Sequence, residues 1–473
     1  MKHHFHTLNA AWRRPCIAAL LALAAVAPAM AAEAQQKVLP NGLTVIVQPD
    51  HRAPTAVHML WVRVGSMDEV DGTSGVAHVL EHMMFKGSAT LKAGEFSRKV
   101  AALGGRENAF TSKDYTGYFQ QIPVEKLEAV MQLEADRFAT NQWSDEDFRK
   151  ELEVVKEERR MRTEDNPHAR LGELHNAAQF VAHPYRRPIV GWMGDLESLQ
   201  PDDARSFWRT WYTPANAAVV VAGDVDPEKV FALAAQYYGG MPQRAVPERK
   251  PRPEPVQNGV RRVWLKASAE QAVVALSYKV PGLLPQDLLA DTPSAEGTDA
   301  LALMVLDAVL SGYDGARLER ALTQDKGHVA DGADSYYGTL SRGPATFGLT
   351  GIPAKGKTVE QVEAALRAQV TRVAKEGISQ AELERVKAQW VAASVYQQDS
   401  VFNQGRMAGV NWATGYPLDS NERLIVRLRQ VTAVQVQAVA AKYFGDDALT
   451  VATLIPQPLG APRKPAAVAG MRH

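Results

Sequence analysis

Residues 75–87, GVAHVLEHMMFKG, hold the most informative feature of this chain, two histidines four residues apart with a glutamate between them. The segment has a helical pattern, and residues at i and i+4 share one face of a helix. The imidazoles of His78 and His82 can therefore reach a single metal ion. Glu81 borders the same face and can reach a metal-bound water without being a ligand itself. Zinc bound by two neutral imidazoles needs one more anionic ligand and one open position for water.

The order H-x-x-E-H is the inverted form of the zinc pattern H-E-x-x-H. Two histidines on an amphipathic helix can also be ordinary surface or core residues, so the motif needs support from the rest of the chain. At 473 residues the chain is too long for one ordinary core, which predicts two or more domains. Lys+Arg and Asp+Glu are equal at 53 each, and this balance gives no indication of a nucleic-acid partner.

Residues 1–32 have the pattern of a secretory signal peptide. Basic residues up to Arg14 precede an apolar run at 17–27, which is too short to span a membrane stably. Residues 29–31 (AMA) have the small-x-small form of a cleavage site, so we expect cleavage after Ala31 or Ala32. The alternative interpretation of the run is a membrane anchor.

The sole cysteine, Cys16, precedes the apolar run, so cleavage would leave a mature chain without cysteine. Such a chain has neither disulfides nor thiol chemistry, and its stability depends on core packing. We expect an exported, soluble protein of the bacterial periplasm without a stable membrane anchor.

The remaining pattern predicts the α+β class, with two homologous α+β domains that each pack an antiparallel-rich sheet with helices. The first domain is expected at 33–241 and the second at 258–457, followed by a tail at 458–473. Residues 242–257, rich in proline and charge, predict an extended linker. The stretch 196–222 aligns without a gap with 428–454, which indicates a duplication.

Local signals place the first elements. Alternation around Asn41-Gly42 predicts a hairpin followed by another strand within 37–64. Ser74 is expected to cap the helix that carries the two histidines, and Gly87 is expected to end it. A capping box at 144–147 predicts a long helix to about Arg162.

That long helix is the place to look for a third ligand. Glu151 and Glu158 share one stripe of the helix with apolar residues, and a carboxylate there is costly without a partner such as a metal. Glu157 lies on a stripe with Val154 and Met161, so spacing alone does not exclude it. An acidic run of this kind is otherwise a solvated helix face.

Nearly the whole mature chain resembles the insulinase/pitrilysin metallopeptidases, a family that includes the mitochondrial processing peptidases. The resemblance rests on these segments: LPNGLTVIV (39–47), VGSMDE (64–69), GVAHVLEHMMFKG (75–87), GGRENAFTSKDYTGY (104–118), ELEVVKEERRMR (151–162), HPYRRPIVG (183–191) and AGD (222–224).

The resemblance implies a zinc endopeptidase with one Zn²⁺ per chain, held by His78, His82 and Glu158. It selects Glu158 over Glu157 as the third ligand and makes Glu151 an acid that orients a ligand or tunes the site. Glu81 would take the proton of the zinc-bound water and pass it to the leaving amine.

The resemblance also implies a mode of substrate binding. The strand at Asn108 and Ala109 resembles the edge to which an extended peptide adds as an extra strand. Two half-size chains of this family, each with two α+β domains, close into a chamber that admits flexible peptides.

One departure from the family pattern concerns an Arg and a Tyr, seven apart, in the second half of catalytically complete relatives. Thr323 and Ala330 occupy those positions here, and no Arg lies seven before Tyr336 or Tyr337. The expectation is therefore a heterodimer in which a subunit of the same fold supplies the pair. The alternatives are a self-sufficient homodimer and a non-catalytic assembly or binding subunit.

Overall fold

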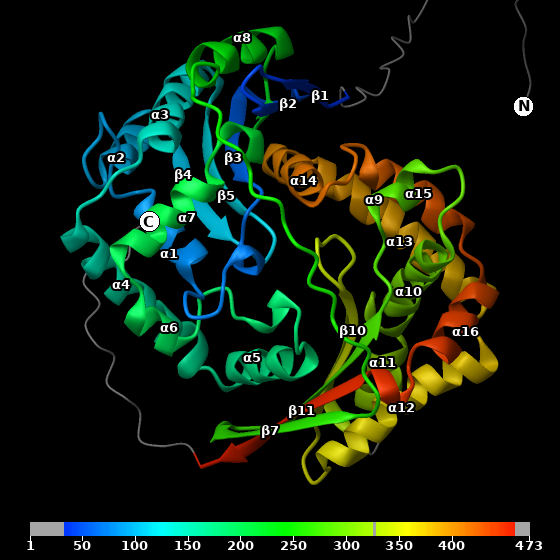
Figure 1. Ribbon diagram of the computed structural model, residues 1–473. Helices are drawn as coiled ribbons and strands as arrows, with labels where there is room; N and C mark the ends of the chain where they lie inside the picture. Colours follow the sequence, from blue (N-terminus) through cyan, green and yellow to red (C-terminus); the bar gives the residue numbers. More distant parts are fainter. Residues whose placement is uncertain (1–32, 325–327, 459–473) are drawn as a thin grey trace, which may run out of the picture.

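The computed structural model describes residues 33–324 and 328–458. It contains two α+β halves, one from the N-terminal part of the chain and one from the C-terminal part, lying side by side (Figure 1). Each half has one sheet with helices against it, so the predicted fold class is confirmed. The expected signal peptide and nearly all of the expected tail lie outside the described residues.

The first sheet has the strand order β1-β2-β6-β3-β5-β4. Its strands are β1 (Gln35–Val38), β2 (Thr44–Pro49), β3 (Thr55–Val62), β4 (Arg106–Thr111), β5 (Thr116–Pro123) and β6 (Ala217–Gly223). The second sheet has the order β7-β11-β8-β10-β9. Its strands are β7 (Arg261–Ser268), β8 (Val273–Val280), β9 (Ala330–Tyr337), β10 (Ala345–Pro353) and β11 (Leu449–Gln457).

Apart from the additional edge strand β1 of the first sheet, the two sheets share one topology. Each has a single parallel pair, β2 with β6 and β7 with β11, and all its other neighbours are antiparallel. The internal repeat falls on matching elements, because 196–222 includes α7 (Pro201–Trp211) and nearly all of β6, while 428–454 includes α16 (Ala433–Lys442) and most of β11. The topology thus supports the duplication that the sequence indicated.

The helices outnumber the strands. Those of the first half are α1 (Val76–Met83), α2 (Glu95–Ala102), α3 (Leu127–Thr140), α4 (Asp145–Arg159), α5 (Pro167–Gln179), α6 (Met193–Ser198), α7 and α8 (Pro227–Tyr238). Those of the second are α9 (Pro285–Leu289), α10 (Ala295–Ser311), α11 (Arg317–Glu319), α12 (Val359–Glu376), α13 (Gln380–Gln398), α14 (Val401–Thr414), α15 (Ser420–Gln430) and α16. Among the helices of the described residues, none combines the length and apolarity needed to cross a membrane.

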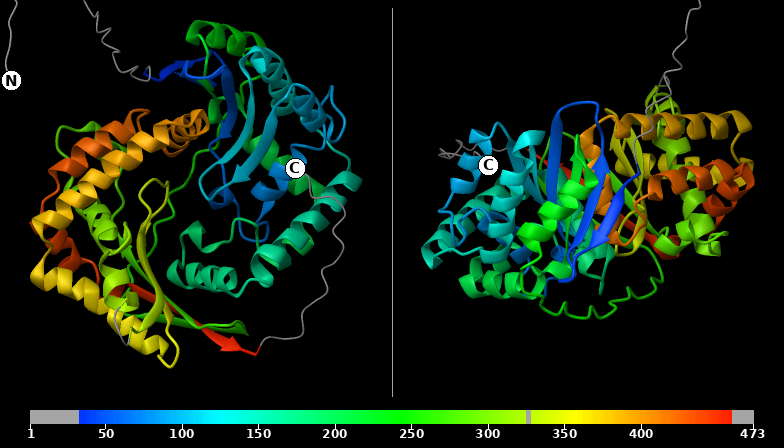
Figure 2. Two further views of the ribbon diagram at one scale, coloured as in Figure 1. Left: turned by 180° about the vertical axis from the view of Figure 1, so that it is seen from behind. Right: turned by 90° about the horizontal axis from the view of Figure 1, so that it is seen from above.

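Each half lends one helix to the other. Helix α14 of the second half packs on β3 and β6, and α5 of the first half packs on β7 and β11 (Figures 1 and 2). Each sheet is therefore covered on one face by helices of its own half and on the other by a helix of the opposite half. Since the buried apolar surface is shared in both directions, the halves stabilise one another.

Small residues allow α14 to lie close to the first sheet. A Cβ added at Gly409 would lie 2.0 Å from Cε2 of Trp61, and one at Gly405 would lie 3.1 Å from Cγ1 of Val57. On the other side of the molecule the contact is partly polar, with His175 Nε2 of α5 2.7 Å from Ser277 Oγ of β8. The close approach of α14 requires glycine because Trp61 fills the space a side chain would need.

The segment 242–257 has neither helix nor strand, as expected for the linker, and Figure 2 (right) shows it along the lower edge of the molecule. Its charged residues bind the first half. Arg249 Nε donates to Asp68 Oδ1 at 2.7 Å, and Glu254 accepts backbone hydrogen bonds from residues 181–183. We propose 33–241 and 258–457 as the two domains, with this segment as a linker that is fastened rather than loose.

Two local expectations about α1 were wrong. Ser74 does not cap the helix, because its hydroxyl donates to Asp195 Oδ2 at 2.5 Å; the carboxylate of Glu69 accepts from the N–H groups of Gly75 (3.0 Å) and Ala77 (2.9 Å) instead. The helix ends at Met83, before Gly87, which instead bridges Lys92. In both cases the residue that the local pattern assigned to an end of α1 binds a partner outside the helix.

Two matched glycine substitutions test the docking of α14. Gly409→Ala should lower the free energy of unfolding by about 1–3 kcal/mol, because the added methyl group meets Trp61. Gly172→Ala on α5 adds a methyl group to open space. It should raise the free energy of unfolding by about 0.5–1 kcal/mol, because alanine favours the helix more than glycine does. Denaturant unfolding of both variants is the measurement, and equal stability of the two would contradict the close packing.

Candidate metal centre

Helix α1 carries both histidines of the motif on one buried face. His78 and His82 are 8% and 6% exposed, and their ring centroids are 4.8 Å apart in an edge-to-face arrangement. The helix begins after Gly75, whose φ of 91° lies in the left-handed region that favours glycine. The carboxylate of Glu69 satisfies its first N–H groups, so the start of the helix is fixed within the core.

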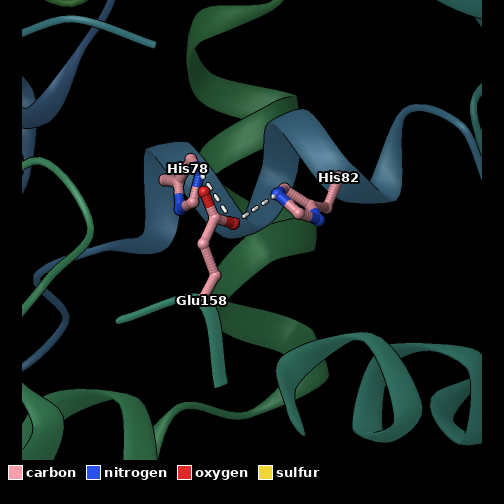
Figure 3. A group of neighbouring side chains, drawn as sticks. All are labelled: His78, His82 and Glu158. Carbon is pink, nitrogen blue, oxygen red and sulfur yellow. Dashed lines mark ion pairs between the residues drawn. The ribbon is translucent and has the colours of Figure 1, made fainter. Parts of the chain in front are cut away.

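Glu158 of α4 completes the cluster, as Figure 3 shows. Its Oε2 lies 3.7 Å from Nε2 of His78 and 3.4 Å from Nε2 of His82. One ligand atom from each of the three residues lies within 4.8 Å of the other two. In a tetrahedral site with bonds of roughly 2.0–2.1 Å, ligand atoms lie about 3.4 Å apart, so this donor set fits zinc.

Glu151 lies seven residues before Glu158 on the same stripe of α4 and contacts the other side of the His82 ring. Its Oε1 lies 2.9 Å from Nδ1 of His82, and its second oxygen pairs with Lys86. Although burial works in the opposite direction, these hydrogen bonds lower the pKa of Glu151. An anionic partner at Nδ1 orients the ring so that Nε2 faces Glu158, which is the arrangement that supports a metal-ligating histidine.

Glu81 lies beside the cluster and is held from outside α1. The hydroxyl of Thr111, the last residue of β4, donates to its Oε2 at 2.5 Å. Burial raises the pKa of Glu81 to about 7, and the nearby carboxylate of Glu158 acts in the same direction. A carboxyl group that titrates near neutrality and lies next to a metal site is suited to accept and return a proton.

The charges of the cluster depend on one another. Burial alone would raise the pKa of Glu158, but the hydrogen bond from His82 and the charge of His78 lower it to about 2. Burial also disfavours the charged form of His82, yet Glu151 and Glu158 raise its pKa to about 9. The carboxylate at the third ligand position is therefore anionic at neutral pH, and His82 would release its proton on binding a metal, since a ligating imidazole is neutral.

Glu157, the alternative that spacing left open, points elsewhere. Its carboxylate pairs with Arg160 at 3.0 Å, and its side chain is 35% exposed. Oε1 of Glu158 pairs instead with Arg162 at 2.5 Å. A π-helical turn at Arg160–Glu164 follows α4 and carries Arg162.

Three neighbours of the site were missed by the sequence reasoning: Thr111, Lys86 and Arg162. Arg162 lies four residues after Glu158, so the i,i+4 rule could have found it. Lys86 lies beyond the end of α1, and Thr111 arrives through β4, so no local pattern links them to the site.

Asn108 and Ala109 lie on β4, the strand at the edge of the first sheet that packs against α1. Asn108 is exposed, and its Oδ1 accepts the backbone N–H of Ala109 at 2.8 Å. An edge strand beside the metal site offers backbone groups to an extended peptide.

The two departure positions lie in the second half, away from this cluster. Thr323 donates its hydroxyl to the backbone of Glu319, and Ala330 is fully buried as the first residue of β9. Tyr337 donates its hydroxyl to the backbone of Pro281, whereas Tyr336 is 66% exposed.

Comparison with known proteins matches most of the chain to one family. The family described as "Insulinase (Peptidase family M16)" matches residues 44–191, and the domain described as "Peptidase M16 inactive domain" matches residues 198–390. The chain is 32% identical over 354 residues to the zinc protease PqqE of Helicobacter pylori, which covers 74% of this chain and 76% of that protein.

Solved structures show the same architecture. A protease from Helicobacter pylori superposes with a TM-score of 0.82 at 29% identity, covering 90% of this chain and 100% of that one. The first half of the periplasmic protease PqqL from Escherichia coli gives a TM-score of 0.75 at 20% identity and is covered to 92%. Against full-length PqqL the same match covers 48% of that chain, so its fold contains one unit like this chain in about half its length.

Two substitutions at adjacent glutamates test the ligand set. Glu158→Gln should lose most of its zinc, since the amide removes the anionic donor that faces both imidazoles. Glu157→Gln should keep zinc near the wild-type level because its partner is Arg160. Metal analysis of the purified proteins is the measurement, and equal zinc loss in both variants would show that the ligand is misassigned.

Proposed function

Because this chain belongs to the insulinase (M16) family of zinc proteases, we propose that it is a zinc endopeptidase subunit that hydrolyses peptides or unfolded polypeptides. The observation that carries the proposal is the convergence of His78, His82 and Glu158 beside the carboxylate of Glu81. We infer one Zn²⁺ per chain, because only this cluster among the described residues offers three such donors within reach of one ion.

Each side chain has a distinct task in this mechanism. His78, His82 and Glu158 would hold zinc, and zinc would supply a lowered pKa for a bound water and a polarising charge for the peptide carbonyl. Glu81 takes the proton of the attacking water and returns it to the leaving amine. Thr111 holds one oxygen of Glu81, which fixes the direction of the other. Glu151 orients His82 and so acts on the site without contact with the substrate.

The substrate would bind as an extended strand along β4, next to Asn108 and Ala109. Main-chain hydrogen bonds would provide most of the affinity, so many sequences would be accepted. We further propose export to the periplasm after cleavage near Ala31 or Ala32. The support is the signal-peptide pattern of residues 1–32 and the fold shared with PqqL, which is a periplasmic protease.

Glu81→Gln is the direct test of the proton-transfer role. The amide keeps the size of the side chain but cannot accept a proton, so turnover should fall by roughly 10²–10⁴-fold while zinc stays bound. Glu153→Gln, on the exposed side of α4, is a matched control that should leave both unchanged. Peptide hydrolysis and zinc content are measured together, and near-normal turnover of the Glu81 variant would remove Glu81 from the mechanism.

We propose that the active form is a heterodimer with a second chain of the same fold. By the family resemblance, Thr323 and Ala330 stand at the positions of the cross-chamber Arg and Tyr of complete relatives, and neither side chain can stabilise an oxyanion as a cationic donor would. One such donor is commonly worth about 10²–10³ in rate. The match to the first half of PqqL covers only 48% of that chain, which leaves room for a second unit of this size and supports the pairing of two such units.

Reconstitution tests the pairing. The zinc-loaded chain alone should hydrolyse peptides slowly, and adding a same-fold chain that has the Arg and Tyr should raise the rate by about 10²-fold or more. A neighbouring gene of similar length is the first candidate for that chain. Full activity of this chain alone would favour a homodimer, and zinc loading without activity in any combination would favour a non-catalytic subunit.

A further inference from the structure

The segment 66–69 connects two parts of the first half that serve the metal centre. At one end, the carboxylate of Glu69 caps the start of α1, the helix with both histidines. At the other, the N–H groups of Ser66 and Met67 donate to the carbonyls of residues 112 and 113, at 3.1 and 2.9 Å. Those carbonyls belong to the turn between β4 and β5. The segment therefore sets the position of β4, and of Thr111 at its end, relative to α1.

The second half grips this same junction. Arg342, in the loop 338–344 that joins β9 to β10, donates two hydrogen bonds of 2.9 Å to the carboxylate of Asp68. Its guanidinium also donates to the backbone carbonyl of Asp114, in the β4–β5 turn, at 2.8 Å. Arg342 of the second half thus connects the segment 66–69 to the turn that follows β4, the proposed substrate-binding strand.

The tip of the loop is shaped to fit this contact. The hydroxyl of Tyr185 donates to Oδ1 of Asp114 at 2.5 Å and accepts the N–H of Gly343 at 2.9 Å. A Cβ at Gly343 would lie 2.5 Å from the ring of Tyr185, so the backbone approaches as closely as glycine permits. The tip is held by its backbone as well as by Arg342.

The contact between Arg342 and Asp68 is largely buried. The side chains of Asp68 and Arg342 are 3% and 12% exposed. A paired, two-point arginine–carboxylate contact is strong and directional, and its geometry is not reproduced by lysine. Arg249 of the linker also contacts Asp68, at 2.7 Å, so Asp68 keeps a cationic partner when Arg342 is removed. Loss of Arg342 should therefore loosen the junction without exposing an unpaired buried carboxylate.

We propose that Arg342 is a positioning residue through which the second half fixes β4 against α1. It holds the substrate-binding edge and the Thr111–Glu81 contact in register with the metal centre, although it touches neither substrate nor metal. The effect on hydrolysis rests on the proposed peptidase function, whereas the effect on the order of β4 does not.

Amide hydrogen exchange tests the proposal without any activity. In Arg342→Ala, exchange of residues 106–116 should accelerate by about tenfold or more, while the central strand β6 stays as slow as in the wild type. Arg262→Ala is the matched control. It removes another two-point pair, with Glu363 at 2.8 and 2.7 Å, within the second half, and it should leave 106–116 unchanged.

Kinetics of the complete complex supply the second readout. Arg342→Ala should lower kcat/KM by about 10–100-fold, mainly through KM, with zinc content unchanged. Arg342→Lys should resemble Arg342→Ala, because a point charge cannot make the two-point contact. Gly343→Ala keeps the arginine but displaces the tip of the loop from Tyr185. It should also accelerate amide exchange of residues 106–116, by less than Arg342→Ala does.

Unchanged exchange at 106–116 in both Arg342→Ala and Gly343→Ala would overturn the proposal. Accelerated exchange with normal KM would also overturn it, since the strand would then be looser without consequence for the substrate. Absence of peptide hydrolysis by the chain in any combination would refute the proposed function, and the exchange experiment would still decide whether Arg342 orders β4.

Discussion

The burial of several ionisable side chains next to α1 is the constraint on which the rest of this structure depends. His78, Glu81, His82 and Glu158 are each less than 9% exposed, and so is Glu151. Charged groups in such a place are costly unless each has a partner. The structure meets this need by pairing His82 with Glu151 and Glu158, and Glu81 with Thr111, and the donor set that remains fits a divalent metal. For this reason the metal centre is part of the packed interior of the first half.

The exchange of helices between the halves makes that arrangement cooperative. The site lies entirely in the first half, but the first sheet is covered on one face by α14 of the second half, and Trp61 of β3 packs against Gly409 of that helix. The contact between Arg342 and Asp68 adds a polar tie close to α1. A half without its counterpart would expose apolar faces of its sheet, so the pair of domains is the unit that can hold the site in place.

Duplication and divergence explain why only one half carries the metal centre. The sheets have the same topology apart from the extra edge strand β1, and α7 with β6 matches α16 with β11. The histidine pair and its glutamate partners occur only in the first half, whereas the second contributes α14, the loop with Arg342 and the positions Thr323 and Ala330. The second half thus supports the site from outside, and residues 198–390, which include much of this half, match a domain described as inactive. Within the chain, one half holds the metal centre and the other supports it. The proposed pairing of a zinc-bearing chain with a chain that supplies the missing Arg and Tyr separates the roles in a similar way.

The sequence by itself determined what depends on short-range spacing. The hairpin at Asn41-Gly42 and the capping box at Ser144 follow from local turn and cap residues. The one-sided placement of His78 and His82 and the shared stripe of Glu151 and Glu158 follow from the helical period of 3.6 residues. Choosing Glu158 over Glu157 needed the family resemblance, because spacing left both open.

Only the tertiary structure decided the contacts made between distant segments. It gave Ser74 to Asp195 and the cap of α1 to Glu69, brought Thr111 to Glu81, paired β2 with β6 in parallel and exchanged α5 and α14. A hydrogen-bonding group binds whichever partner the fold brings within reach, and the sequence around Ser74 holds no trace of an aspartate 121 residues away. Spacing along the chain therefore fixed which residues face the metal, and packing between distant segments fixed what holds them there.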